Sequence, residues 1–175
     1  MRILRRLFWF GTVVLFEHRN AVSVGSPCTV VAASQENLAD LLEFESPRQL
    51  EVYRDFLSRG DRGYLGYLEG RCVHRSWVQM GPRQVRLFRR LSYALRAGEA
   101  YVHYCETAPE ARGKNVYPAV LARVAEELGG SRRLLIATTV SNPASVRGIE
   151  KAGFVPVRRY RVAVVLGWTF GWGSR

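Results

Sequence analysis

A short basic loop between a predicted strand and a predicted helix is the segment of this 175-residue sequence whose residue types best suit ligand chemistry. Arg112, Gly113, Lys114 and Asn115 follow a strand that ends near Thr107, and an amphipathic helix begins at once. The first turn of a helix leaves its N–H groups unpaired, and the helix dipole adds positive character there. Gly lets a ligand approach the backbone closely, and Asn tolerates positive φ. The loop therefore predicts a phosphate or pyrophosphate ligand, with an ordinary basic helix start as the alternative.

A second segment follows a continuous apolar run, Leu134–Val140, that is typical of a strand covered on both faces. It reads Ser-Asn-Pro-Ala-Ser-Val-Arg-Gly-Ile-Glu-Lys-Ala-Gly-Phe from Ser141 to Phe154. Together the two segments resemble the GNAT superfamily of acyl-CoA-dependent acetyltransferases. The loop resembles the family's pyrophosphate signature, Q/R-x-x-G-x-G/A, and the second segment its N-x-x-A/S pattern followed by E-K-x-G-F. The resemblance covers about residues 64–166.

The resemblance implies that acetyl-CoA, or another acyl-CoA, is a co-substrate and that an amine accepts the acyl group by direct attack. It implies that the pyrophosphate lies on the loop and that the pantetheine arm pairs with the strand end as an added strand would. The residues implied in cofactor binding are Cys105, Thr107, Arg112, Gly113, Lys114, Asn115, Val116, Tyr117, Asn142 and Ser145. Asn115 stands where the family usually has Gly. Tyr117 stands where it has Gly or Ala, so its ring must point away from the phosphates.

Few residues near these segments suit proton transfer. Many family members carry a Tyr before the Glu-Lys pair, placed to protonate the departing thiolate, but here Ile149 occupies that position and no hydroxyl stands nearby in the sequence. A thiolate can instead take its proton from water. Glu106, at the strand end beside the implied thioester, is the first candidate for the base. Tyr104 shares its face by strand alternation, so the two could form a relay. His74 and His103 are weaker candidates, because a lone strand histidine is usually packed and hydrogen-bonded.

The elements that must position these residues form a mixed pattern. Hydrophobic periodicity predicts strand 29–33, helices 34–44 and 46–60, strands 64–68, 72–80 and 100–107, helix 115–128, strand 134–140, helix 142–152 and strand 154–166. This order predicts one α/β (mixed α+β) GNAT-like domain over residues 29–166, with a central, mixed, mostly antiparallel sheet flanked by helices. Residues 1–28 are interpreted as a basic leader, with Arg2, Arg5 and Arg6, and an edge strand. Residues 167–175 are interpreted as a C-terminal tail.

Residues 81–98 are interpreted as a basic helical insertion. Apolar residues recur there at helical spacing: Val85, Leu87, Phe88, Leu91, Ala94 and Leu95. The same segment contains five arginines: Arg83, Arg86, Arg89, Arg90 and Arg96. The segment fits a surface helix docked on the sheet, or a lid or docking surface for an acidic substrate, membrane or protein.

The net charge and the cysteine content limit the kinds of partner, the kinds of site and the compartment that we expect. Lys+Arg number 26 and Asp+Glu 15, a net charge of +11, which favours an anionic partner such as cofactor phosphate, nucleic acid or an acidic membrane surface. The three cysteines lie far apart, without a CxxC pair or a His at ligand spacing. Neither a metal site nor a disulfide framework is therefore expected, and a reduced cytoplasmic protein fits. The apolar run at residues 7–16 is too short to cross a bilayer and is interpreted as a core strand, with membrane-surface contact as the alternative.

The resulting prediction is an N-acetyltransferase that moves an acetyl group from acetyl-CoA to a primary amine. The basic segment 81–98 favours an anionic small molecule or peptide as acceptor. One alternative is a catalytically inactive GNAT-fold binding module, in which Asn115 and Tyr117 prevent productive binding of CoA. The other is a basic protein that binds nucleic acid or a membrane surface through residues 1–20 or 81–98. No nucleic-acid-binding motif supports that second alternative.

Overall fold

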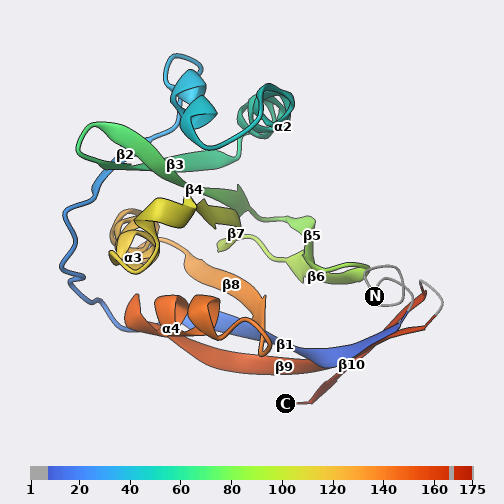
Figure 1. Ribbon diagram of the computed structural model, residues 1–175. Coiled ribbons are helices and arrows are strands. Elements are labelled where there is room, and N and C mark those ends of the chain that lie inside the picture. The colour runs from blue at the N-terminus through green and yellow to red at the C-terminus, as the bar shows by residue number, and fades with distance from the viewer. Residues whose placement is uncertain (1–7, 166–167, 175) are drawn as a thin grey trace.

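An eight-stranded sheet organises the computed structural model, which describes residues 8–165 and 168–174 (Figure 1). The elements are β1 (Phe8–His18), β2 (Thr29–Ala32), η1 (Leu38–Glu43), α2 (Pro47–Ser58), β3 (Arg62–Leu68), β4 (Arg71–Met80), β5 (Arg83–Phe88), β6 (Leu91–Leu95), β7 (Glu99–Thr107), η2 (Pro109–Ala111), α3 (Val116–Leu128), β8 (Arg133–Thr139), α4 (Pro143–Lys151), β9 (Phe154–Val165) and β10 (Trp168–Ser174). The strand order is β10-β9-β1-β8-β7-β4-β3-β2. Only the β7–β8 pair of this sheet is parallel in the described residues, which confirms the predicted mixed, mostly antiparallel sheet.

Each face of the sheet is covered by different elements. The helices α3 and α4 cover one face, where the apolar stripe of α3 packs against β7 and β8 in one core cluster. On the other face, η1 and α2 pack over β3 and β4 around Tyr53, Leu65 and Trp77. The β5–β6 hairpin packs over β1, β8 and β9 in a third cluster, which includes Val85 and Leu135. Figure 1 shows α2 and the hairpin apart from each other along the sheet.

The segment 81–98 is a β-hairpin, so the predicted helical insertion is wrong. Val85 and Leu87 are buried two residues apart on β5, whereas Gln84 and Arg86 are exposed, which is the period of a strand. The two strands pair with each other from Arg83↔Leu95 to Phe88↔Leu91 and form a separate two-stranded sheet. The arginines still gather on this segment, but they lie on a hairpin.

The two ends of the chain also differ from the prediction. β1 pairs with β8 on one side and β9 on the other, so it is an inner strand and not an edge strand. Its residues 13–16 are all buried because both faces of the sheet are covered there. The expected tail contains β10, which pairs with β9. The basic leader with Arg2, Arg5 and Arg6 lies outside the described residues.

The helices that frame the site follow their local sequence signals. Ser46-Pro47 opens α2 with Pro in its first turn, and Asn142 caps α4, both as predicted. The helix expected over 34–44 is reduced to the 3₁₀ helix η1. Its cause is local: the Asn37 side chain bonds the Ala32 carbonyl and the Ser34 N–H, which holds residues 34–37 in a turn instead of a helix.

Candidate active site

A gap between β7 and β8 is the centre of the candidate site. The two strands pair only from Glu99↔Arg133 to Val102↔Ile136, after which β8 continues along β1. The N–H of Ala108 donates to the Val73 carbonyl on the β4 side (2.8 Å). By ladder alternation, the main-chain groups of Cys105 and Thr107 therefore face the gap. An extended ligand could pair with this edge of β7, where the Thr107 carbonyl also accepts from Arg112 Nε (3.2 Å).

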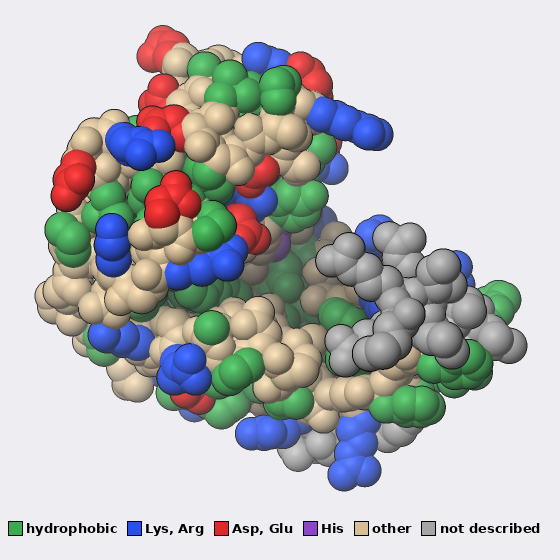
Figure 2. All heavy atoms as spheres, viewed as in Figure 1, with side chains coloured by type: hydrophobic (Ala, Val, Ile, Leu, Met, Phe, Trp, Pro, Cys, Tyr) green, Lys and Arg blue, Asp and Glu red, His purple; other side chains and the backbone are tan. Residues whose placement is uncertain are grey.

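A cavity of about 1390 Å³ opens at this gap. Residues of α3, α4, β7 and β8 line one part of it, and residues of α2, β4 and β5 line the other. The cavity therefore connects the two faces of the sheet. Figure 2 shows a hollow between the part of the molecule that carries α2 and the part below it, with acidic and basic side chains at the rim and a histidine inside.

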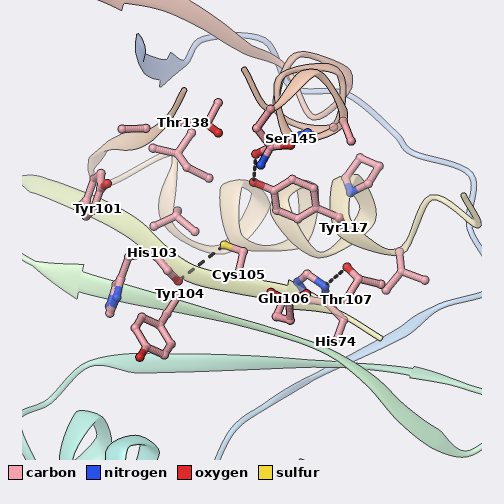
Figure 3. A pocket seen from close by; sticks show the side chains of 18 of the residues that line it. His74, Tyr101, His103, Tyr104, Cys105, Glu106, Thr107, Tyr117, Thr138 and Ser145 are labelled. Atoms are coloured by element: carbon pink, nitrogen blue, oxygen red, sulfur yellow. Dashed lines mark hydrogen bonds between the residues drawn. The ribbon is translucent and has the colours of Figure 1, made fainter. Parts of the chain in front are cut away.

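A β-bulge in β7 distributes side chains between these two faces. Arg75↔Glu106 and Trp77↔His103 leave Tyr104 and Cys105 together opposite Ser76. Tyr104 takes the left-handed conformation (φ 53°) that the bulge requires. Figure 3 shows Cys105 directed toward Tyr117 and Tyr104 directed to the opposite side of the strand. The bulge at the end of β7 thus sends neighbouring side chains to the two opposite faces of the sheet, and both sets line the cavity.

The predicted anion loop has the backbone conformation that its residue types suggested. Gly113 (φ 81°) and Asn115 (φ 59°) are both left-handed, and Asn115 caps α3 without a side-chain capping bond. Within the part of the chain that the structure describes, no protein group accepts a hydrogen bond from the N–H groups of residues 113–117. Pro118 has no N–H to satisfy. Unpaired N–H groups at a helix start, with left-handed residues before them, form a concave anion site.

Two charged residues of the prediction bind each other. Arg112 donates from Nη2 to Glu106 Oε1 (3.0 Å) and from Nε to the Thr107 carbonyl (3.2 Å). Arg112 therefore ties the loop to the end of β7. Two exposed lysines stand at the loop: Lys114 lies within it, and Lys151 of α4 donates from Nζ to Asn115 Oδ1 (2.9 Å). Glu106 is about half exposed, and its carboxylate is already held by Arg112.

The expected relay between Tyr104 and Glu106 is not formed. The Tyr104 hydroxyl accepts a long hydrogen bond from Gln49 Nε2 (3.4 Å) on α2, and its ring contacts Phe56. No hydrogen bond joins Tyr104 and Glu106 in the described residues. Both side chains are exposed, as alternation beyond the bulge predicts, but each has its own partner.

Tyr117 points away from the loop, as expected for a large side chain at a position where the family has Gly or Ala. Its ring lies against Gly148 of α4, where an added Cβ would stand 2.6 Å from Cδ1 of Tyr117. Its hydroxyl is 3.5 Å from Ser145 Oγ (Figure 3). Burial raises the pKa of Tyr117 well above its usual value, so the hydroxyl stays protonated at neutral pH. The sequence around Ile149 lacks a hydroxyl, but the fold places the Tyr117 hydroxyl of α3 beside α4.

Asn142 and Ser145 meet at the start of α4. Asn142 Oδ1 accepts from the Ser145 N–H (3.1 Å), which is the bond of a helix cap. Asn142 therefore has a structural role whether or not it contacts a ligand. Cys105 is partly buried, and burial raises the pKa of its thiol to about 11, which keeps it from acting as a thiolate nucleophile.

His74 is a buried neutral histidine beside the cavity. Its Nδ1 and Nε2 lie 2.7 Å from Thr107 Oγ1 and 2.8 Å from Ser76 Oγ. Burial, together with Arg75, lowers the pKa of His74 to about 3. Both ring nitrogens are already hydrogen-bonded, so His74 does not serve as the base.

The buried state of His74 makes stability depend on pH. Below the unfolded pKa of about 6.5, the unfolded chain binds a proton that the folded chain excludes until about pH 3. We expect this residue to lower the free energy of unfolding by about 1.4 kcal/mol per pH unit below pH 6.5. Urea unfolding of wild type and His74→Gln between pH 5 and pH 7 measures it. The variant should show the shallower slope, and equal slopes would contradict the assignment.

Some functional candidates were not found from the sequence. Asp61, between α2 and β3, is buried at 3% exposure and lies beside His103. Arg86, named from the sequence as part of a basic helical segment, lines the cavity from β5 instead. No spacing in the sequence links these residues, because the tertiary fold alone brings them together. The described residues contain no group of His, Cys, Asp or Glu able to hold a metal ion, and no helix among them is long and apolar enough to cross a membrane.

Solved structures with this arrangement are GNAT-family acetyltransferases. A GNAT-family acetyltransferase from Colwellia psychrerythraea aligns over 94% of this chain and 57% of its own, with a TM-score of 0.67 and 15% identity. A GCN5-related N-acetyltransferase-like protein from Streptococcus suis aligns over 93% and 64%, with a TM-score of 0.57 and 13% identity. An aminoglycoside 6'-N-acetyltransferase from Acinetobacter baumannii aligns over 73% and 90%, with a TM-score of 0.54 and 13% identity.

These likenesses establish the fold. No family model matches the sequence, and no curated protein matches it either. The chain spans about three-fifths of the length of the Colwellia and Streptococcus proteins that it matches.

Proposed function

We propose that this GNAT-fold chain is an acetyl-CoA-dependent N-acetyltransferase. The observation that carries the proposal is the row of unpaired N–H groups at residues 113–117, which stands next to the gap between β7 and β8. An anion site and a free strand edge are the two features that a diphosphate followed by an extended amide-bearing arm requires. CoA has both parts in that order.

The coenzyme would lie along the free edge of β7. Its diphosphate would accept hydrogen bonds from the loop amides, with Lys114 adding charge, and its pantetheine amides would pair with Cys105 and Thr107. The residues proposed to hold it are those named from the sequence: Cys105, Thr107, Arg112, Gly113, Lys114, Asn115, Val116, Tyr117, Asn142 and Ser145. Arg112 and Asn142 would act by holding the loop and α4 in place, because their side chains are engaged there.

The reaction would be direct transfer. The amine nitrogen would attack the thioester carbonyl, and the C–S bond would break to give an amide and CoA. Most of the rate gain would come from holding the amine and thioester together and from main-chain N–H groups near the bulge that polarise the carbonyl. The Tyr117 hydroxyl stays protonated and could donate a hydrogen bond to the leaving sulfur, while the thiolate takes its proton from water.

The acceptor would carry negative charge. Arg59, directly after α2, and Arg86 of β5 line the cavity on the face away from α3. Arg89 and Arg90 continue the basic surface along the hairpin. Arg59 is ion-paired with Asp55 (3.1 Å), whereas Arg86 is exposed. A small molecule or peptide with a primary amine and an acidic group fits this surface.

An inactive binding module is the second candidate function. The Arg112–Glu106 ion pair favours it, because an arginine that binds a carboxylate contributes less to a phosphate. The third candidate function is general binding of nucleic acid or a membrane surface through the hairpin. It requires that the affinity fall steeply as the salt concentration rises.

Calorimetry with two ligands tests the proposal. We expect acetyl-CoA to bind and S-acetylpantetheine, which lacks the diphosphate, to bind at least about a hundredfold more weakly, since two or more charge-assisted hydrogen bonds are lost. Release of CoA over time, followed with a thiol reagent, separates an enzyme from an inactive module. Absence of binding by acetyl-CoA would refute the proposal, and equal binding of the two ligands would refute the loop assignment.

A further inference from the structure

A buried carboxylate faces a cavity histidine on the side of the sheet that carries α2. The Asp61 side chain is 0% exposed, and His103 Nε2 lies 3.7 Å from its Oδ2. Arg83 Nη1 donates to Asp61 Oδ1 (2.7 Å), and Gln79 Nε2 donates weakly to Oδ2 (3.4 Å). The carboxylate is therefore held in place from β4 and β5 while one oxygen stays directed at the imidazole.

His103 has one buried and one available ring nitrogen. Nε2 is buried without a hydrogen-bond partner, whereas the side chain is 13% exposed and lines the cavity. An unpaired buried nitrogen beside a carboxylate is most easily satisfied as an N–H donor to that carboxylate, after a shift of about half an ångström or more. The Nε2–H tautomer leaves the lone pair on Nδ1, the ring nitrogen that Asp61 does not engage.

The ring of His103 is fixed at the opening of the gap. His103 directly follows Val102, the last β7 residue paired with β8, and directly precedes the bulge at Tyr104. Its ring stacks on Tyr101 (6.3 Å between centroids, 6° between planes) and meets Phe56 of α2 edge-on at 5.1 Å. The imidazole is thus held on the α2 side of the point where the strands part, while Cys105 and Tyr117 lie on the α3 side.

We propose that His103 is the catalytic base of this site and that Asp61 is its positioning residue. The proposal rests on the proposed acetyltransferase function. The attacking amine forms its bond to the thioester carbonyl carbon, and its proton moves to Nδ1 of His103. The C–S bond breaks, and the CoA thiolate takes a proton from water. The imidazolium then returns its proton to solvent, so no oxidant, metal or further reactant is needed.

The other candidates for this role are already engaged. Glu106 is ion-paired with Arg112, and both nitrogens of His74 are hydrogen-bonded to Thr107 and Ser76. The remaining histidine of the sequence, His18, is on β1 and does not line the cavity. Among the described histidines, His103 alone combines a place on the cavity wall with a free ring nitrogen.

The test uses acetyl-CoA with water or hydroxylamine as the nucleophile, because the natural acceptor is unidentified. We expect His103→Ala to slow CoA release by a hundredfold or more, within the range of about 10²–10⁴ for general-base catalysis, and to leave the affinity for acetyl-CoA unchanged. Free imidazole should restore part of the rate, because it can enter the vacated space. His18→Gln is the matched control and should keep the wild-type rate.

Asp61 is tested by its effect on the imidazole. Asp61→Asn should slow CoA release and move the proton of His103 from Nε2 toward Nδ1, which ¹⁵N NMR of the three histidines detects. The conservative variant Asp61→Glu keeps a carboxylate and should retain more of the rate and of the Nε2–H tautomer than Asp61→Asn. If Asp61→Asn loses rate while the tautomer of His103 is unchanged, Asp61 has only a structural role and the positioning role is overturned.

The failures of the two proposals are distinguishable. A wild-type protein that does not bind acetyl-CoA refutes the acetyltransferase proposal itself. A wild-type protein that binds acetyl-CoA but releases no CoA with either nucleophile is an inactive binding module and refutes both proposals. A rate of CoA release that does not depend on His103 overturns the assignment of His103 alone. Loss of rate without imidazole rescue and with weakened acetyl-CoA binding also overturns it, because it indicates a structural role.

Discussion

Replacement of Gly113 by valine is expected to lower the affinity for acetyl-CoA by about a hundredfold, and to raise its Michaelis constant correspondingly. Gly113 has φ 81°, a conformation that a β-branched residue adopts only with strain. Relief of that strain would turn the neighbouring amides away from their common focus. The loss of two amide–phosphate hydrogen bonds at about 1.5 kcal/mol each gives the expected factor. Calorimetry with acetyl-CoA measures it directly.

A turn far from the site provides the control for Gly113→Val. Gly70, in the β3–β4 turn, has φ 78° and, like Gly113, no atom within 4 Å of an added Cβ. Gly70→Val therefore introduces the same backbone strain without touching the loop. We expect the two variants to lose similar stability and only Gly113→Val to lose affinity. Similar affinities for the two would remove the loop from the binding site.

Replacement of Gly153 by alanine is expected to destabilise the fold by about 3 kcal/mol or more, among the largest effects of a single methyl group in this chain. Gly153 has φ 84°, and an added Cβ would lie 1.9 Å from the Asn20 carbonyl oxygen. The Gly153 carbonyl also accepts from the Arg19 and Asn20 N–H groups (both 3.2 Å), so the two segments cannot separate cheaply. Gly153 is thus required because its backbone packs directly against the backbone of Asn20.

Thermal unfolding measures the effect of Gly153→Ala. At about 2–4 °C per kcal/mol for a domain of this size, the midpoint should fall by roughly 10 °C. Gly60→Ala is the control, since Gly60 has φ 79° and open space around an added Cβ. It should lose only the backbone strain, about 1–2 kcal/mol. An equal loss in both variants would mean that the contact with Asn20 contributes nothing.

The sequence predicts those parts of the fold whose signals are local. α3 and α4 have clear stripes, caps and stops, and the β3–β4 turn is marked by Glu69-Gly70. The prediction for residues 81–98 failed because Leu87, Leu91 and Leu95 recur every four residues, which fits one face of a helix and also one face of a strand. Burial by the sheet decided for the strand. The inner position of β1 depends on pairing with β8 and β9, more than a hundred residues away, which local patterns do not encode.

In the candidate site, too, the features with a local sequence signal were predicted and those that depend on distant contacts were not. The conformations of Gly113 and Asn115 follow from their residue types, and the direction of Tyr117 follows from its size. The Arg112–Glu106 ion pair was missed because Arg112 was assigned to cofactor binding and Glu106 to proton transfer from the amine, and neither to the other. The His103–Asp61 pair was missed because it joins β7 to the turn before β3, and only the packing of α2 against the sheet brings the two together.

A crystal structure with bound CoA is the most direct test of the central claim. The account predicts diphosphate oxygens within hydrogen-bonding distance of the N–H groups of residues 113–117, with the pantetheine arm in the gap beyond Val102. Electron density for the coenzyme at another place, with those amides facing solvent, would contradict it.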